Sequence, residues 1–128
     1  MTVLETYVEK EIWKPIKYDG FEIYQVSSWG RIRSIPRILE YVDGRTRRYK
    51  GYIRRLAQDV NGFVIVTLHN SDESVNKTFR VHKLVAEHFM TKPSESRRIV
   101  HHIDGDRTNN HISNLMYIKK IRKGEVYI

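Results

Sequence analysis

The chain has 128 residues, enough for one domain or two very small modules with a modest core. Its hydrophobic content of 40% and charged content of 30% are those of a soluble folded protein, and no apolar run approaches the roughly 20 residues of a membrane span. The absence of cysteine excludes disulfides and thiolate metal sites, which leaves His, Asn and carboxylates as possible metal ligands. Because the start also lacks a signal-peptide pattern, we expect a cytoplasmic protein with no membrane partner.

Positive charge is the strongest compositional signal. The net charge is +8 and the isoelectric point is near 9.8, which favours a polyanionic partner. Residues 31–55 contain nine basic and two acidic residues, so this stretch accounts for most of the net charge. A local phosphate-binding surface is therefore favoured over a charge spread evenly across a solvated surface.

Short strands and turns are predicted between residues 13 and 34. After a turn at residues 19–20, residues 21–26 alternate as in a short strand. A second turn at residues 28–30 leads to a strand in which Ile32 is expected to face inward and both flanking arginines outward. Most aromatic side chains of this stretch are expected in the core.

Two hairpins are predicted in the middle of the chain. Asp43-Gly44 is a hairpin signal next to basic residues, and Asn61-Gly62 is the strongest hairpin turn in the sequence. Residues 63–68 are β-branched and apolar enough for a central strand, and residues 75–81 are expected to return as its partner. His69 is expected at a strand end in solvent, without a functional role.

An amphipathic helix is predicted after the second hairpin and is expected to end at residues 91–93. Its apolar stripe contains Val81, Leu84, Val85, His88 and Phe89. His88 and the neighbouring His82 are expected as core or helix-face histidines rather than ligands, because neither pairs with a carboxylate at helical spacing.

The most informative stretch is residues 100–118, with the sequence VHHIDGDRTNNHISNLMYI. It predicts a strand that ends in His101 and His102, a tight turn around Gly105, and a second strand opened by Asn114. Because side chains alternate faces along a strand, one imidazole is expected to face a metal while its neighbour faces a substrate.

This motif resembles that of the HNH endonuclease family of phages and introns. The stretch HHIDGDRTNN, followed by NLMY, is similar to the family frame NHIDGNKTNN followed by NLEW, and VHKLVA at residues 81–86 is similar to the VHRLVA-like helix that precedes the frame. The resemblance implies an α+β fold, in which a small antiparallel β module precedes a helix and a ββα-metal core. The final helix is expected to be shortened, because residues 119–128 contain a helix-breaking glycine and β-branched residues.

The resemblance also implies residue roles. His102 would be the general base, His101 a metal ligand, and Asn114 a catalytic-site residue that braces the turn. The third functional position of the family falls at Lys123, and a protonated lysine cannot ligate a cation. A divalent metal is expected, with Mg²⁺ first and Mn²⁺, Ni²⁺ or Zn²⁺ as other choices, and the carboxylates of the turn, Asp104 and Asp106, are possible substitute ligands.

A second resemblance covers YQVSSWGRIRS at residues 24–34, which is similar to the YEVSNLGRVRS-like stretch of a NUMOD4-like, DNA-contacting module. We therefore expect a basic module at residues 1–57 and an HNH core at residues 58–128. The implied partner is double-stranded DNA, cut or nicked by phosphodiester hydrolysis in the cytoplasm of a bacterial host if the protein is phage-encoded. The expected DNA-binding residues are Arg31, Arg33, Arg37, Arg45, Arg47, Arg48, Arg97 and Arg98.

Two alternatives remain beside a metal-dependent endonuclease. Lys123 and the short tail also fit a weakened or inactive DNA-binding protein of the same fold. A structural zinc module using His101, His102 and His111 is less favoured, because it would lack cysteine ligands and its adjacent histidines would point apart.

Overall fold

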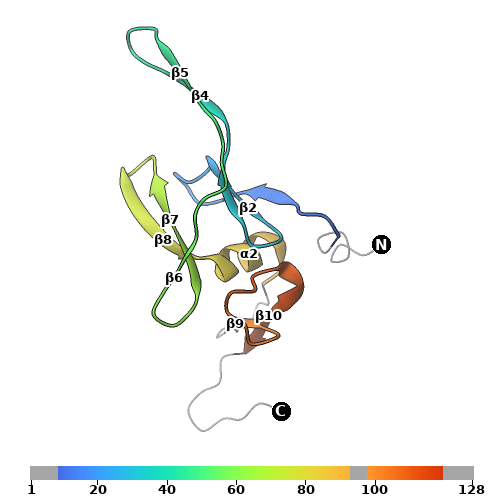
Figure 1. Cartoon of the computed structure of the whole chain (residues 1–128). Helices are drawn as coiled ribbons and strands as arrows, with labels where there is room; N and C mark the ends of the chain where they lie inside the picture. The colour runs from blue at the N-terminus through green and yellow to red at the C-terminus, as the bar shows by residue number, and fades with distance from the viewer. Residues whose placement is uncertain (1–8, 93–97, 120–128) are drawn as a thin grey trace.

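The computed structural model describes residues 9–92 and 98–119, where small antiparallel sheets are arranged around and beside one buried helix (Figure 1). This is the mixed α and β architecture expected from the sequence. In these described ranges no helix is long and apolar enough to cross a membrane.

The first sheet has the strand order β1 (Trp13–Pro15), β2 (Tyr24–Ser27), β3 (Ile32–Ser34). The second strand begins later than the alternation predicts, because the N–H of Tyr24 donates to the carbonyl of Phe21 and closes a turn there. Its inward face is formed by Tyr24 and Val26, while the next strand buries Ile32 as expected.

The second sheet is the predicted Asp43-Gly44 hairpin, formed by β4 (Arg37–Glu40) and β5 (Thr46–Tyr49). Gly44 has a φ of +86°, the left-handed conformation that this turn requires. The hairpin extends away from the rest of the molecule (Figure 1). The chain then returns along β3, where the N–H of Arg54 donates to the carbonyl of Ile32.

The third sheet confirms the Asn61-Gly62 hairpin. It has the order β6 (Ala57–Gln58), β7 (Val64–Asn70), β8 (Val75–Arg80). The central strand alternates strictly, with Val64, Val66 and Leu68 buried and the side chains between them more exposed.

Helix α2 (Val81–Phe89) confirms the predicted amphipathic helix. Its buried surface is wider than the predicted stripe, because His82 and Ala86 are also buried. Lys14 Nζ donates to the carbonyl of His88 and Lys17 Nζ to that of Glu87, at 3.0 and 3.1 Å. Two cations thus lie at the carbonyl end of the helix, where its dipole favours positive charge.

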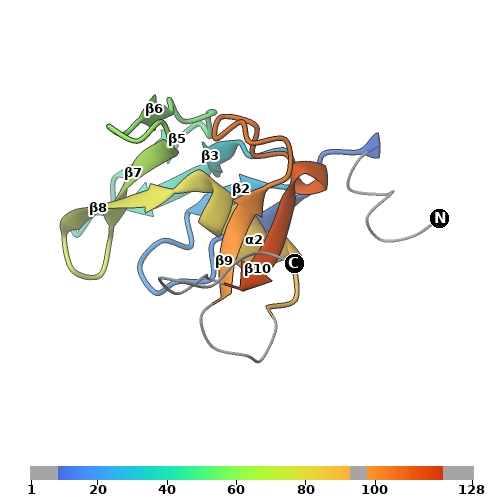
Figure 2. The ribbon, with the colours of Figure 1, turned by 90° about the horizontal axis from the view of Figure 1, so that it is seen from below.

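The last sheet pairs β9 (Arg98–His102) with β10 (Leu115–Lys119), which follows a 3-10 turn at η1 (Ile112–Asn114). The two strands lie side by side next to α2 (Figure 2). The predicted shortened final helix falls in residues 120–128, outside the described residues.

One hydrophobic core joins these elements. It contains Val26 and Ile32 from the first sheet, Leu68 from the third, Val85 from α2, and Leu115 from β10. The two halves of the chain therefore pack as one body in the described ranges. The division after residue 57 stays a prediction.

Candidate active site

The turn between β9 and β10 is held by the side-chain amide of Asn114. Its Oδ1 accepts from the N–H of Asp104 at 3.0 Å, and its Nδ2 donates to Asp104 Oδ1 and to the carbonyl of Asn109, both at 2.9 Å. The backbone carbonyl of Asn114 also accepts from the N–H of Ile103. The geometry is that of a brace across the turn, and Asn114 is itself 7% exposed.

Both turn carboxylates are used within the turn. The carboxylate of Asp104 accepts from Asn109 Nδ2 and from the N–H of Asp106, in addition to the bond from Asn114 Nδ2. These three hydrogen bonds lower the pKa of Asp104. Asp106 Oδ1 accepts from the hydroxyl and the N–H of Thr108, which lower the pKa of Asp106. These bonds to Asp106 use Oδ1 alone, and Asp104 Oδ2 accepts only the bond from Asn109 among those named, so substitution of either carboxylate as a metal ligand stays a prediction.

His101 and His102 lie on opposite faces of β9, as strand geometry requires. His101 is exposed and lies opposite the exposed Met116, whereas His102 is 5% exposed and lies opposite the buried Leu115. The two imidazoles therefore have different surroundings, one in solvent and one against the body of the protein.

His102 is oriented by Asn110. The distance from His102 Nε2 to Asn110 Oδ1 is 2.7 Å. Because an amide oxygen only accepts, Nε2 carries the proton and Nδ1 of the neutral ring carries the lone pair. In the sequence, Asn110 is only one of several asparagines that follow the glycine of the turn. No local spacing rule links it to His102, eight positions away, and only the folded turn brings them together.

Behind His102 lies His82 of α2. The ring centroids of the two histidines are 4.9 Å apart, and His82 also stacks on Phe63 at 5.0 Å. Burial, followed by repulsion from His102, Lys83 and Arg80, lowers the pKa of His82 to about 4. His82 is thus a neutral core histidine at pH 7, as the sequence predicted, and its Nδ1 has no hydrogen-bond partner in the described part of the chain.

Arg107, which the sequence did not single out, connects the turn to the third sheet. Its guanidinium donates to the carbonyl of Asn61 and lies 4.5 Å from the ring centroid of Phe63. Arg80 also lies over Phe63, at 4.4 Å, and pairs with Asp59 at 3.4 Å. Both arginines serve contacts within the protein.

Metal-binding side chains are sparse here. Within residues 9–92 and 98–119, no group of three or more His, Asp or Glu side chains converges on one point. Of the three histidines proposed for a zinc site, His101 and His102 point apart, and His111 stacks on Trp29 while its Nδ1 accepts from the N–H of Ser113. His101 is the exposed imidazole at the end of this strand, and Lys123 lies outside the described residues.

The predicted DNA-binding arginines occupy two different settings. Arg31 forms an ion pair with Glu11, in which it lowers the pKa of that carboxyl. Arg33 lies 4.0 Å from the ring centroid of Trp13 and donates to Gln25 Oε1 at 2.8 Å. These two side chains are exposed only in part and are already engaged.

On the β4–β5 hairpin, Arg47 and Arg48 are exposed and Arg37 is half-buried. Arg37 and Arg47 share one face with Tyr49, each 4.8 Å from its ring centroid, and Arg48 lies on the other face opposite Ile38. Arg45, beyond β4, pairs with Asp43. Of the remaining two, Arg97 lies outside the described residues, and for Arg98 the structure describes the backbone, paired with Lys119.

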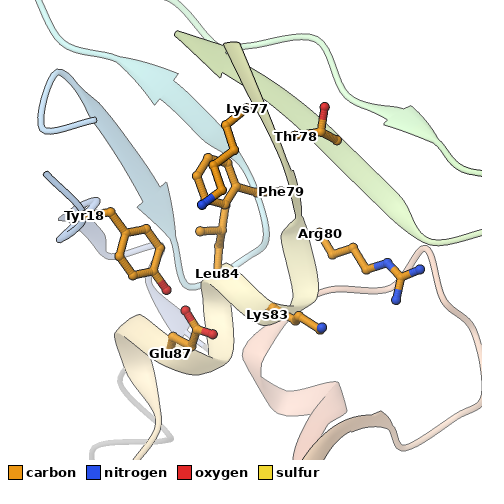
Figure 3. A pocket seen from close by; sticks show the side chains of 8 residues that line it. All are labelled: Tyr18, Lys77, Thr78, Phe79, Arg80, Lys83, Leu84 and Glu87. Atoms are coloured by element: carbon orange, nitrogen blue, oxygen red, sulfur yellow. The ribbon is translucent and has the colours of Figure 1, made fainter. Parts of the chain in front are cut away.

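A groove of about 360 Å³ between β8 and α2 is separate from these residues (Figure 3). Lys77, Arg80 and Lys83 lie on its walls with one carboxylate, Glu87. No predicted site residue lines it. The candidate site is instead the surface around the end of β9.

Comparisons with known proteins match two segments of the chain. Residues 11–69 match the model of the NUMOD4 motif, and residues 79–123 match that of an HNH endonuclease family. An uncharacterized HNH endonuclease of Acanthamoeba polyphaga mimivirus is 30% identical over 119 residues, which are 92% of this chain and 26% of that protein. DNA endonuclease I-HmuI of Bacillus phage SP01 is 35% identical over 107 residues, which are 83% of this chain and 51% of that protein.

A solved structure is also similar. It is described as DNA binding and cleavage by the HNH homing endonuclease I-HmuI, and it matches with a TM-score of 0.61 and 33% sequence identity. The match covers 84% of this chain and 52% of that chain. The chain thus spans between about a quarter and about half of the length of these relatives.

We predict that the stability of the protein falls in acid because His82 becomes protonated on unfolding. Its folded pKa of about 4 lies below the ordinary value of 6.5, so the unfolded chain binds more protons between these values and stability falls as pH falls through that window. The full loss is about 3 kcal/mol. In urea unfolding at pH 7 and pH 4.5, His82→Phe should lose correspondingly less stability than the wild type. Parallel losses in the two proteins would show that His82 is not the titrating group.

Asn114→Ala should destabilise the protein by about 1–3 kcal/mol, because it leaves the N–H of Asp104 and the carbonyl of Asn109 without their partner. The free energy of unfolding measures this loss, and amide hydrogen exchange at Asp104 should accelerate. Asn76→Ala is the matched control, since the exposed Asn76 amide bonds only His69 in the described contacts and its loss should cost less than about 0.5 kcal/mol. Equal stability of the two variants would contradict the brace.

Proposed function

We propose that this chain, as a member of the HNH endonuclease family, binds double-stranded DNA and hydrolyses a phosphodiester bond with a divalent cation. Its NUMOD4 motif lies ahead of its HNH segment. The observation that supports this most is the end of β9, where an oriented His102 adjoins an exposed His101 on a braced turn. Because successive side chains of a strand lie on opposite faces, the two imidazoles are proposed to have different roles.

His102 is proposed as the general base. The hydrogen bond from Nε2 to Asn110 leaves the lone pair on Nδ1, so a nucleophilic water would lose its proton to that nitrogen. General-base assistance of this kind contributes roughly 10²–10⁴-fold. His82 and Phe63 restrict the ring from behind, which holds it in one orientation.

His101 is proposed to hold the cation together with DNA phosphate oxygens and waters. One exposed imidazole fits a weakly held ion, and Mg²⁺ commonly keeps several waters; Mn²⁺, Ni²⁺ or Zn²⁺ also accept imidazole. The ion would supply charge stabilisation at the scissile phosphate. The protein's own contribution is to place His101 on a strand whose turn cannot shift.

The β4–β5 hairpin is proposed as the main DNA-binding element of the NUMOD4 segment. A two-stranded ribbon is narrow enough to enter the major groove of B-form DNA. Arg37 and Arg47 lie on one face, and both are adjacent to a tyrosine ring that limits their rotamers. Arg31 would have to exchange Glu11 for a phosphate, so we expect a smaller contribution from it.

The second candidate is a DNA-binding protein with a weakened nuclease centre. The observation that favours it is that residues 9–92 and 98–119 contain no group of three or more His, Asp or Glu side chains that could hold a metal ion. DNA binding without cleavage under any metal condition would support this function over the first.

Cleavage of a supercoiled plasmid tests the proposed reaction. We expect nicked or linear product with Mg²⁺, Mn²⁺ or Ni²⁺ and none with EDTA. His102→Ala should reduce the rate by about 10²–10⁴-fold. His69→Ala is the matched control, because His69 is an exposed strand histidine bonded to Asn76. Equal rates for the wild type and His102→Ala would exclude His102 as the base.

Salt dependence of DNA affinity tests the hairpin. Replacing both Arg37 and Arg47 by alanine should flatten the slope of log affinity against log salt by about two, because two phosphate contacts are lost. The corresponding double lysine variant keeps both charges and should keep the slope. Fluorescence anisotropy with one DNA duplex between 50 and 200 mM salt measures the slope for both variants. An unchanged slope in the alanine variant would mean that these side chains do not contact phosphates.

A further inference from the structure

We infer that the turn at residues 27–31 of the NUMOD4 segment is a positioning element of the HNH site, acting on His102 through Asn110. This inference rests on the proposed role of His102 as general base. It gives the NUMOD4 segment a second role, because its turn would shape the catalytic site from within the protein as well as binding DNA.

Hydrogen bonds and burial hold this turn in one conformation. Ser27 Oγ accepts from the N–H groups of Trp29 and Arg31, at 3.1 and 3.0 Å, and the Ser27 carbonyl accepts from the N–H of Gly30. Ser27 and Ser28 are fully buried. Gly30 has a φ of +86°, which closes the turn in a conformation that side chains with a Cβ rarely adopt.

Three successive residues of this turn contact three successive residues of the HNH segment. The carbonyl of Ser28 accepts from the N–H of Ile112 at 2.8 Å. The ring of Trp29 stacks on His111 with centroids 5.9 Å apart and planes inclined by 23°. Gly30 lies so close to Asn110 that a Cβ on the glycine would be 2.9 Å from both the Cβ and the carbonyl oxygen of Asn110.

Asn110 connects the turn to the candidate site, because it contacts both Gly30 and His102. It is 5% exposed, and its Oδ1 is the partner of His102 Nε2 at 2.7 Å. A Cβ at position 30 would therefore push the backbone and the side chain that hold the imidazole. Because hydrogen bonds weaken steeply with distance and angle, a small displacement of Asn110 releases the ring.

A merely structural role for Gly30 predicts a loss of stability and nothing more. Gly62 separates the two roles, because it has nearly the same φ, +84°, yet a Cβ there would meet no atom within 4 Å. Alanine at either glycine imposes the same backbone strain. Alanine at position 30 alone also meets Asn110.

The experiment follows the imidazole Nε2–H of His102 by nitrogen-15 NMR of the metal-free, DNA-free full chain, assigned by its disappearance in His102→Gln. The wild type and Gly62→Ala should show a protected Nε2–H. Gly30→Ala and Asn110→Ala should lose that protection, whereas Asn110→Asp, which keeps the acceptor oxygen, should retain it. Gly30→Ala should also slow single-turnover cleavage at saturating DNA by about tenfold to hundredfold, with DNA affinity unchanged.

A wild-type Nε2–H signal in Gly30→Ala would overturn the inference. If Gly30→Ala does not fold, Trp29→Ala removes the stack on His111 without adding atoms, and faster exchange of the Nε2–H then supports the inference while unchanged exchange overturns it. Because the NMR readout needs neither metal nor DNA, absence of cleavage in every protein would count against the proposed function and leave the positioning result intact.

Discussion

Burial of α2 is the constraint on which the rest of this structure depends. The helix has nine residues, too few to be stable alone, and it is held by packing against the first and third sheets, both strands of the last sheet and η1. Since Val81, Leu84 and Val85 are almost completely buried, displacing the helix would open the common core. The same helix carries His82, so the element that stabilises the fold also forms the wall behind His102.

Rigid polar bonding complements this apolar core at the site. The turn after β9 has few apolar contacts, and its shape is held by the amides of Asn114 and Asn109 and the carboxylates of Asp104 and Asp106. Lowered pKa values keep both carboxylates ionised and accepting at neutral pH. Each carboxylate thus holds the shape of the turn through at least one of its oxygens.

The charge of the chain is divided between internal and external uses. Arg31, Arg80 and Arg107 form ion pairs, backbone hydrogen bonds or ring contacts inside the protein, although net charge alone would assign them to DNA. The β4–β5 hairpin is an extended ribbon (Figure 1), on which Arg37 and Arg47 lie over the ring of Tyr49. Local charge density therefore locates the basic stretch, but the contacts decide which of its cations are engaged within the protein.

The sequence by itself determined the hairpins at Asn61-Gly62 and Asp43-Gly44, the span of α2 and the strand–turn–strand around His102, because turn residues and hydrophobic period act locally. Its resemblances to a NUMOD4-like module and to the HNH endonuclease family agree with the family models that residues 11–69 and 79–123 match. Only the tertiary structure decided that Asn110 orients His102, that Arg31 pairs with Glu11, and that Gly30 approaches Asn110. These contacts join residues from different elements, up to 80 positions apart in the case of Gly30 and Asn110. No periodicity encodes such distances, and they follow from the shared core that brings the two segments together.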